Sequence, residues 1–410
     1  MQTLLVIAKV LPEPASSAAG KRMLQLIDLF QEAGWNVEMA SVAKTSQFSV
    51  DLKTLGIPFH EIELNSSSFD VFIAALKPNV VLFDRFMTEE QFGWRVAEHC
   101  PNAMRILDTE DLHGLRAGRE KAVKENRNFV TSDLLNTTAF REIASIWRCD
   151  LSLIISEFEM NLLEDFFNVR ATQLFYLPFL LGSAELNQLD KSPPFSERQH
   201  FISIGNFLHE PNLDAVTHLH KTIWPKLRAK LPMAELHVYG AYVPESITQL
   251  HSTSNGFIIK GRAENVHKVM RDARLLLAPL RFGAGLKGKL FDAMLNGTPN
   301  ITSTIGAEGM NGGEQWPGRI TDDVEAYVNS AATLYQNETE WTKASEQCQQ
   351  MLLRFNKEKF STAFHSILKH NLENLTEHRM QNFTGAMLQQ QQFNSSKYMS
   401  LWIEAKNKSA

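Results

Sequence analysis

A glycine-rich loop with two lysines carries the clearest chemical signal in the sequence. Residues 279–289 follow an apolar run and place Gly283, Gly285 and Gly288 within six positions, together with Lys287 and Lys289. Glycines let backbone amides approach a ligand closely, and a helix that begins at such a loop offers unpaired N–H groups and its positive dipole end. The pattern predicts a phosphate-binding loop without the GxxxxGK[ST] spacing of a P-loop. A plain glycine-rich turn with solvent-facing lysines is the alternative.

Two acidic residues follow in the same region of the chain. Asp292 comes one helical turn after Lys289. A carboxylate there could accept hydrogen bonds from ribose hydroxyls, as acidic residues do in dinucleotide-binding folds, or it could simply complement the helix dipole. Glu308 lies in a second glycine-rich loop, residues 305–310, on the same expected edge of the sheet.

Two loops of the N-terminal half are further candidates. Residues 14–20 are small, end in Gly20, and join an expected strand to a helix, so they could approach a phosphate. Residues 108–113 contain three acids and a histidine directly after a strand. Asp111 and His113 could orient or deprotonate a hydroxyl group, or bind a sugar. The alternatives are an ordinary strand-to-helix connection at 14–20 and a solvated turn at 108–113.

These loops need strands and helices that bring them to one edge. Short apolar runs alternate with helical patterns along most of the chain, which is typical of β-α-β units with a parallel sheet. The sequence therefore predicts an α/β fold of two doubly wound, Rossmann-like parallel-sheet domains that face each other across a cleft. The expected strands are 3–8, 35–42, 57–62, 80–83, 104–107, 151–155, 201–205, 234–239, 257–261, 275–279 and 300–302.

The alternation lapses at one place, where Pro193 and Pro194 exclude a helix interior or a central strand. We predict a first domain at 1–181, a linker at 182–198, a second domain at 199–356, and C-terminal helices at 357–410 that pack back toward the first domain. Near the end, Tyr398, Leu401 and Trp402 form an apolar cluster. This cluster predicts a short helix docked on the body, because disordered tails rarely carry such residues.

Composition excludes several classes of protein. The 410 residues carry 41 Lys+Arg and 46 Asp+Glu, a net charge of −5, which argues against a protein that coats nucleic acid or anionic lipid. Three scattered cysteines give no disulfide framework and no zinc-ligand spacing. No run approaches the ~18 apolar residues of a membrane span, and the apolar start is too short for a signal peptide. We therefore expect a cytoplasmic protein, with a peripheral membrane contact left open.

Several motifs, in order, resemble the C-terminal donor domain of family 4 glycosyltransferases. They are residues 203–212, 238–240, 261, 279–289, 291–299 and 306–309. The likeness covers roughly residues 200–310 and includes a G-x-G-[IL]-K-x-K loop and a G-A-E-G loop. The N-terminal half fits the same two-domain GT-B fold more loosely. The resemblance implies an anomer-retaining hexosyltransferase that takes a nucleotide-diphosphate sugar as co-substrate and needs no cofactor or metal.

The resemblance also implies roles for individual residues. Lys287 would contact the donor diphosphate and act in catalysis, supported by Lys289 or Arg281. Asp292 matches the second acid of the family's Glu-x7-Glu motif, while Ala284 stands where the first acid would be. The predicted catalytic set is completed by Asp111 and His113, and further donor contacts are expected from Gly20, Gly205, Asn206, Gly283, Gly285, Leu286 and Glu308.

Two other functions fit the same sequence. Ala284 in place of an acid favours a non-catalytic GT-B scaffold that binds a nucleotide. An epimerase of the same fold would act on the sugar nucleotide without an acceptor. The donor base, the sugar and the acceptor cannot be read from the sequence, so glycan, lipid, protein and small-molecule acceptors all stay open.

Overall fold

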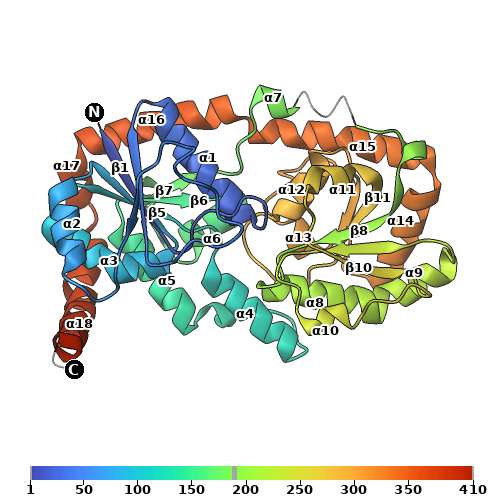
Figure 1. The fold of residues 1–410 in the computed structure, drawn as a ribbon, viewed down its shortest axis with the longest axis horizontal. Coiled ribbons are helices and arrows are strands. Elements are labelled where there is room, and N and C mark those ends of the chain that lie inside the picture. Colours follow the sequence, from blue (N-terminus) through green and yellow to red (C-terminus); the bar gives the residue numbers. More distant parts are fainter. Residues whose placement is uncertain (1, 187–191, 409–410) are drawn as a thin grey trace.

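A seven-stranded parallel sheet organises the N-terminal half of the computed structural model, which describes residues 2–186 and 192–408 (Figure 1). The strand order is β3-β2-β1-β4-β5-β6-β7. The central strands are apolar and buried, as expected for a parallel sheet covered on both faces. The strands are β1 (Thr3–Ala8), β2 (Asn36–Ser41), β3 (Phe59–Glu61), β4 (Val80–Asp84), β5 (Met104–Asp108), β6 (Leu151–Ile154) and β7 (Leu174–Tyr176).

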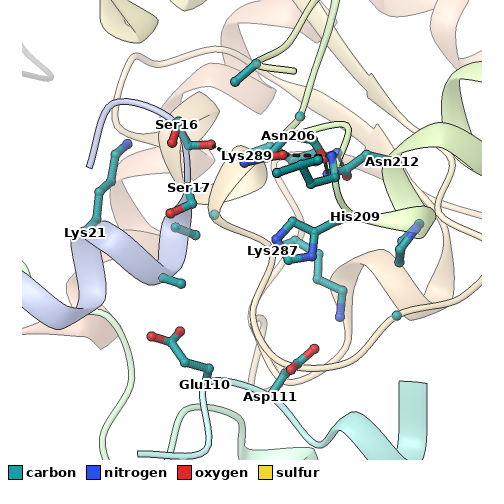
Figure 2. Close-up of a pocket in the computed structure, with 18 of the residues that line it drawn as sticks. Ser16, Ser17, Lys21, Glu110, Asp111, Asn206, His209, Asn212, Lys287 and Lys289 are labelled. Carbon is teal, nitrogen blue, oxygen red and sulfur yellow. Dashed lines mark hydrogen bonds between the residues drawn. The ribbon is translucent and has the colours of Figure 1, made fainter. Parts of the chain in front are cut away.

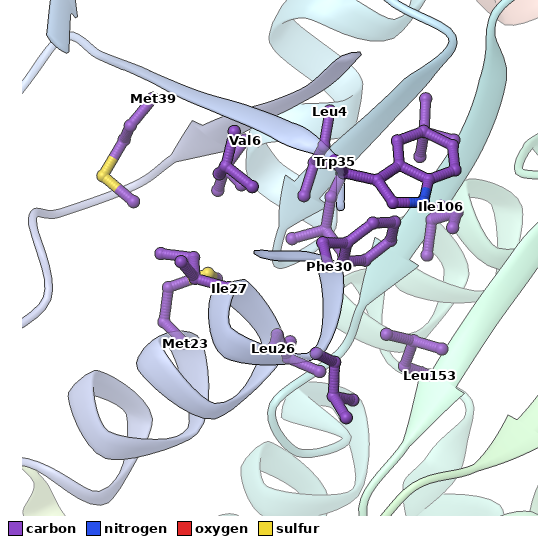
Figure 3. Packing of buried hydrophobic residues seen from close by; sticks show 14 of the residues in the cluster. Leu4, Val6, Met23, Leu26, Ile27, Phe30, Trp35, Met39, Ile106 and Leu153 are labelled. Carbon is purple, nitrogen blue, oxygen red and sulfur yellow. The ribbon is translucent and has the colours of Figure 1, made fainter. Parts of the chain in front are cut away.

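Helices cover both faces of this sheet. Apolar residues of α1 at helical spacing, Met23, Leu26, Ile27 and Phe30, pack on strand residues such as Val6 (Figure 3). The helices of this half are α1 (Ala18–Glu32), α2 (Ser68–Leu76), α3 (Phe86–His99), α4 (His113–Lys124), α5 (Thr137–Arg148), α6 (Glu157–Asp165) and α7 (Ser183–Leu186).

A six-stranded parallel sheet, order β10-β9-β8-β11-β12-β13, organises the second half. Its strands are β8 (Gln199–Ile204), β9 (Leu236–Tyr239), β10 (Phe257–Gly261), β11 (Ala273–Ala278), β12 (Asn300–Thr302) and β13 (Gly318–Ile320). Its helices are α8 (Glu210–His218), α9 (Trp224–Lys230), α10 (Glu245–Thr248), α11 (Val266–Asp272), α12 (Gly288–Met294), α13 (Thr304–Ala307), α14 (Val324–Gln336) and α15 (Glu338–Leu352).

The last three helices return to the first sheet (Figure 1). They are α16 (Lys357–Glu373), α17 (Leu375–Met380) and α18 (Phe383–Lys408). Phe364 and Leu368 of α16 are fully buried in the same core as α1. On α18, Ser400 accepts a hydrogen bond from Arg95 at 3.0 Å, and Lys397 pairs with Glu98. The C-terminal helices therefore extend the N-terminal lobe.

The structure differs from the expected elements in three places. Strands β7 and β13 were not predicted; each has only three residues and lies at the edge of its sheet. The sequence also predicts one continuous helix at 212–229, but a π-helical turn at Leu219–Ile223 separates α8 from α9. The tail helix is long rather than short, and it exposes the aromatic rings that were expected to dock: Tyr398 is 66% and Trp402 is 60% exposed. Part of the predicted linker, residues 187–191, lies outside the described residues.

Candidate functional site between the two domains

A cavity of about 510 Å³ lies between the two domains, where strands of both sheets end (Figure 2). Loops that follow β1, β4 and β5 line one side, and loops that follow β8, β9, β10 and β11 line the other. Nine predicted site residues line it: Asp111, His113, Gly205, Asn206, Gly283, Leu286, Lys287, Lys289 and Asp292. Four others, Gly20, Arg281, Gly285 and Glu308, are not among the lining residues.

The two lysines of the glycine-rich loop, residues 279–289, are held at the start of α12. Lys287 Nζ donates to the carbonyl of Gly285 at 2.7 Å, and Lys289 Nζ donates to the side chain of Asn212 at 2.6 Å. Burial lowers the pKa of Lys287 to about 8 against the opposing effect of Glu308. Burial, with the charge of Lys287 nearby, lowers the pKa of Lys289 to about 7. An anion in the cavity would stabilise the charged form of both side chains.

The N-terminal end of α1 faces the cavity from the other domain. Ser17 caps this helix and accepts a hydrogen bond from the Gly20 amide at 3.0 Å. Residues 14–19 line the cavity, so the N–H groups of the first turn are near any anion bound there. Gly20 itself packs on the backbone of Glu13, where a Cβ atom would come within 2.5 Å. Gly20 thus lets the loop fold closely against the helix.

Asp111 and His113 form a small network at the start of α4. Asp111 pairs with Arg116, and His113 Nδ1 lies 3.2 Å from Asp111 Oδ1. Burial disfavours ionisation of Asp111, but Arg116 and His113 outweigh it and lower the pKa of Asp111 to about 2. Glu142, which the sequence did not point to, accepts the backbone N–H of His113 at 2.9 Å. Asp111 is therefore an ionised carboxylate of low basicity, which orients its neighbours and is poorly suited to act as a general base.

Other predicted residues have partners that were not expected. Asp292 pairs with Lys21 of α1 across the cavity at 2.6 Å. Arg281 turns away to the surface, where its guanidinium pairs with Asp214. Asn206 donates to the carbonyl of Ser16, in the other domain, at 3.4 Å.

An interdomain clasp holds the backbone of the glycine-rich loop; it consists of Arg119 of α4 and Glu159 of α6 with their contacts. Arg119 donates to the carbonyl of Gly283 at 2.9 Å and forms a two-pronged ion pair with Glu308. Glu159 accepts the Gly285 amide at 2.7 Å and the Leu112 amide at 3.0 Å. Burial and the nearby charge of Asp111 raise the pKa of Glu159 to about 8.

Ala284 lies between the two points that the clasp holds. Its side chain is 9% exposed and packs with apolar residues of the N-terminal core. The flanking Gly285 has a φ of +62°, and a Cβ there would lie 2.8 Å from the Cβ of Asp111. This close approach of the two domains explains why glycine is needed at position 285. It also gives Ala284 a packing role where the resemblance would place a ligand-binding acid.

No group of three or more His, Cys, Asp and Glu side chains in residues 2–186 and 192–408 is arranged to hold a metal ion. Over the same part of the chain, no helix has the length and apolarity that a membrane crossing requires.

The clasp makes a testable prediction about backbone protection. Replacing Glu159 by Ala removes the acceptor shared by Gly285 and Leu112, so both amides should exchange with solvent about 10- to 100-fold faster, the scale expected when a buried donor loses its acceptor. Hydrogen exchange followed by mass spectrometry measures this. Glu164→Ala, at an exposed position on the same helix, is the matched control. Unchanged exchange at both amides would contradict the clasp.

The chain is similar to known proteins both in sequence and in overall structure. Residues 198–337 match the family model described as "Glycosyl transferases group 1". The chain has no significant match among curated proteins. In overall structure it is similar to sucrose-phosphate synthase from Thermosynechococcus elongatus, with a TM-score of 0.64 at 16% identity over 90% of this chain and 99% of the other.

Two further similar structures contain ligands. Anabaena HepE in complex with UDP and glucose has a TM-score of 0.61 at 11% identity, over 90% of this chain and 100% of the other. The pneumococcal O-GlcNAc transferase GtfA in complex with UDP and GlcNAc has a TM-score of 0.66 at 11% identity, over 90% and 99%. The second domain is thus similar in sequence to group 1 glycosyltransferases, and the whole chain has the two-domain GT-B fold.

Proposed function

We propose that this protein is a retaining glycosyltransferase that moves a hexose from a nucleotide-diphosphate sugar to an acceptor hydroxyl without a bound metal. The observation that carries the proposal is the pair Lys287 and Lys289 at the start of α12, opposite the N-terminus of α1 in one cavity. The match of residues 198–337 to the group 1 glycosyltransferase model supports the same reading. Asp292, about one helical turn after Lys289 on α12, is suited to the ribose hydroxyls once Lys21 releases it.

The catalytic work is to stabilise the charge on the departing diphosphate. As the bond from the sugar C1 to the phosphate oxygen breaks, negative charge grows on that oxygen. Positive groups fixed in advance around it lower the barrier without a reorganisation cost. Lys287, Lys289 and the first-turn amides of α1 supply such groups from two sides. Because their charge comes from side chains and backbone, this scheme requires no metal ion.

The closed arrangement of the domains also protects the reaction. Water competes with the acceptor hydroxyl for the sugar, so a cleft that closes over the donor reduces hydrolysis. The contacts of Arg119 with Gly283 and of Glu159 with Gly285 join the glycine-rich loop to the N-terminal domain in the closed form. Closure and completion of the diphosphate site are therefore one event in this scheme.

Retention follows from where the proton can go. The acceptor hydroxyl attacks C1 from the face that the phosphate leaves, the new C–O bond forms there, and the leaving phosphate oxygen takes the hydroxyl proton. Asp111, which pairs with Arg116 and has a pKa of about 2, is too weak a base to take this proton, and the scheme does not require a protein base. His113, held by Asp111, is proposed to position a sugar or acceptor hydroxyl.

Removal of the Lys287 charge tests the proposal. Lys287→Ala should lower turnover about 100-fold or more, the scale of losing one oxyanion-stabilising donor. The assay follows nucleotide release from UDP, GDP and ADP sugars in EDTA and identifies the anomer of the product by proton NMR. UDP sugars come first, because HepE and GtfA were solved with UDP.

Lys268→Ala, at an exposed position on α11, is the control and should keep full turnover. Wild-type turnover in Lys287→Ala would refute the proposed role. Binding of a nucleotide without any turnover would indicate a scaffold, and conversion of the sugar without nucleotide release would indicate an epimerase.

The lowered pKa values predict how nucleotide binding depends on pH. Lys289, with a pKa of about 7, and Lys287, with a pKa of about 8, are charged below these values and lose charge above them. A diphosphate binds the charged forms, so affinity should fall as the pH rises from about 6 to about 9, with protons taken up on binding at the higher pH. Calorimetry in two buffers of different ionisation enthalpy measures both effects. Lys289→Met should flatten the profile, and a flat wild-type profile would contradict the assignment.

A further inference from the structure

Three polar side chains on the N-terminal side of the cavity have no part in the donor scheme. We call Lys9, Arg85 and Glu110 the strand-end cluster, because they follow β1, β4 and β5. These strands are neighbours in the sheet: β1 pairs with β4, and β4 pairs with β5. All three residues line the cavity. Figure 2 shows Glu110 across the open space from Lys289 and His209.

The backbone at two of these residues adopts a costly conformation. Arg85 has a φ of +69° and Glu110 a φ of +62°, which side chains other than glycine, asparagine and aspartate seldom adopt. The Arg85 amide is tied to the carbonyl of Asp108 at 2.8 Å, and the Asp108 side chain is paired with Arg22. Such strain persists where the surrounding structure enforces it, and it is concentrated at functional sites. Here it turns two side chains toward the cavity.

Both cations of the cluster keep free donor atoms among the described residues, although Arg85 pairs with Asp84 through its Nε atom. The only hydrogen bond of the Lys9 ammonium is a weak one to the sulfur of Met87 at 3.6 Å. Asp84, the nearest acid, instead accepts the backbone N–H of Lys9 and lies 3.4 Å from Arg85 Nε. No described group accepts from the terminal nitrogens of Arg85. Burial, and then the charge of Arg85, lower the pKa of Lys9.

Burial makes Glu110 a poor counter-charge for these cations. Its Oε1 atom is buried and has no hydrogen-bond partner. Burial and the neighbouring charge of Asp108 raise the pKa of Glu110 well above its usual value, which favours the neutral acid over the carboxylate. A protonated carboxyl group is a hydrogen-bond donor. The cluster thus presents an ammonium and a guanidinium to the cavity, beside a carboxyl group whose neutral form can also donate.

We infer that the strand-end cluster binds an oxyanion on the acceptor, a phosphate or carboxylate group carried close to the hydroxyl that is glycosylated. The inference rests on the proposed function and adds the chemical class of the acceptor to it. Arginine and lysine bind such groups through short, charge-assisted hydrogen bonds. The glycine-rich loop and α1 already serve the donor diphosphate, so this cluster is free for a second anion across the cavity.

Inorganic phosphate is the probe for this site. The wild-type chain is first saturated with whichever of UDP, GDP and ADP it binds, which fills the donor side, and phosphate is then titrated and followed by calorimetry. We expect millimolar binding that weakens at least tenfold in Lys9→Met and in Arg85→Gln. Glu110→Gln, which keeps an N–H donor, should retain binding, and Lys53→Met, at an exposed position outside the cavity, is the matched control.

The affinity for the nucleotide alone distinguishes the outcomes. It should stay within about twofold of wild type in Lys9→Met, whose side chain is exposed enough to be replaced without loss of folding. Phosphate that fails to bind the saturated wild type overturns the inference. So does a parallel loss of nucleotide affinity in Lys9→Met and Arg85→Gln, which would assign both cations to the donor. If no nucleotide binds the wild type at all, the proposed function fails first.

Two further probes identify the source of the oxyanion. Glycerol 3-phosphate represents a soluble acceptor, and vesicles of phosphatidylglycerol in phosphatidylcholine represent a lipid headgroup. Competition with inorganic phosphate by glycerol 3-phosphate alone supports a soluble acceptor. Sedimentation with the vesicles that is lost in Lys9→Met supports a lipid acceptor.

Discussion

The hydrogen bonds that the N-terminal domain makes to the backbone of the glycine-rich loop are the constraint on which the site depends. Arg119 holds Gly283 and Glu159 holds Gly285, and between them Ala284 packs into the core of the other domain. With both ends of this segment held, Lys287 follows at a fixed place at the start of α12 and faces the N-terminus of α1. Without the clasp, the N-terminal domain would not make these hydrogen bonds to the glycine-rich loop. The positive groups of the two domains would then no longer be held around one anion.

Burial of charge is the second physical theme. Lys287 and Lys289 lose solvation in the cavity, which lowers their pKa values and leaves them short of a counter-charge. A bound diphosphate would supply that charge. Its interaction with the two buried lysines would then offset their desolvation and contribute to the affinity for the ligand. The acids on the opposite side are engaged differently: Asp108 by Arg22 and Asp111 by Arg116. The cavity therefore presents mainly donors, which suits anionic substrates on both sides.

Part of this site can be read from the sequence because its signals are local. Lys287, Lys289 and Asp292 stand at fixed distances from a strand end and three glycines, and that spacing alone brings them to the cavity. Arg119 and Glu159 give no local signal, since each lies inside a helix and meets its loop partner across 164 and 126 residues of chain. In the C-terminal tail, by contrast, a local signal was misleading. The apolar cluster predicted a docked face, but α18 contacts the N-terminal domain through Ser400 and Lys397, and Trp402 is exposed.

The proposed function requires that both domains bind a single nucleoside diphosphate at once. A crystal structure of the chain with the nucleoside diphosphate that it binds most tightly tests this claim directly. The β-phosphate should lie between Lys287 and the first turn of α1, and the ribose should contact Asp292 in place of the Lys21 side chain. A nucleotide bound to one domain only, or outside the cavity, would contradict it.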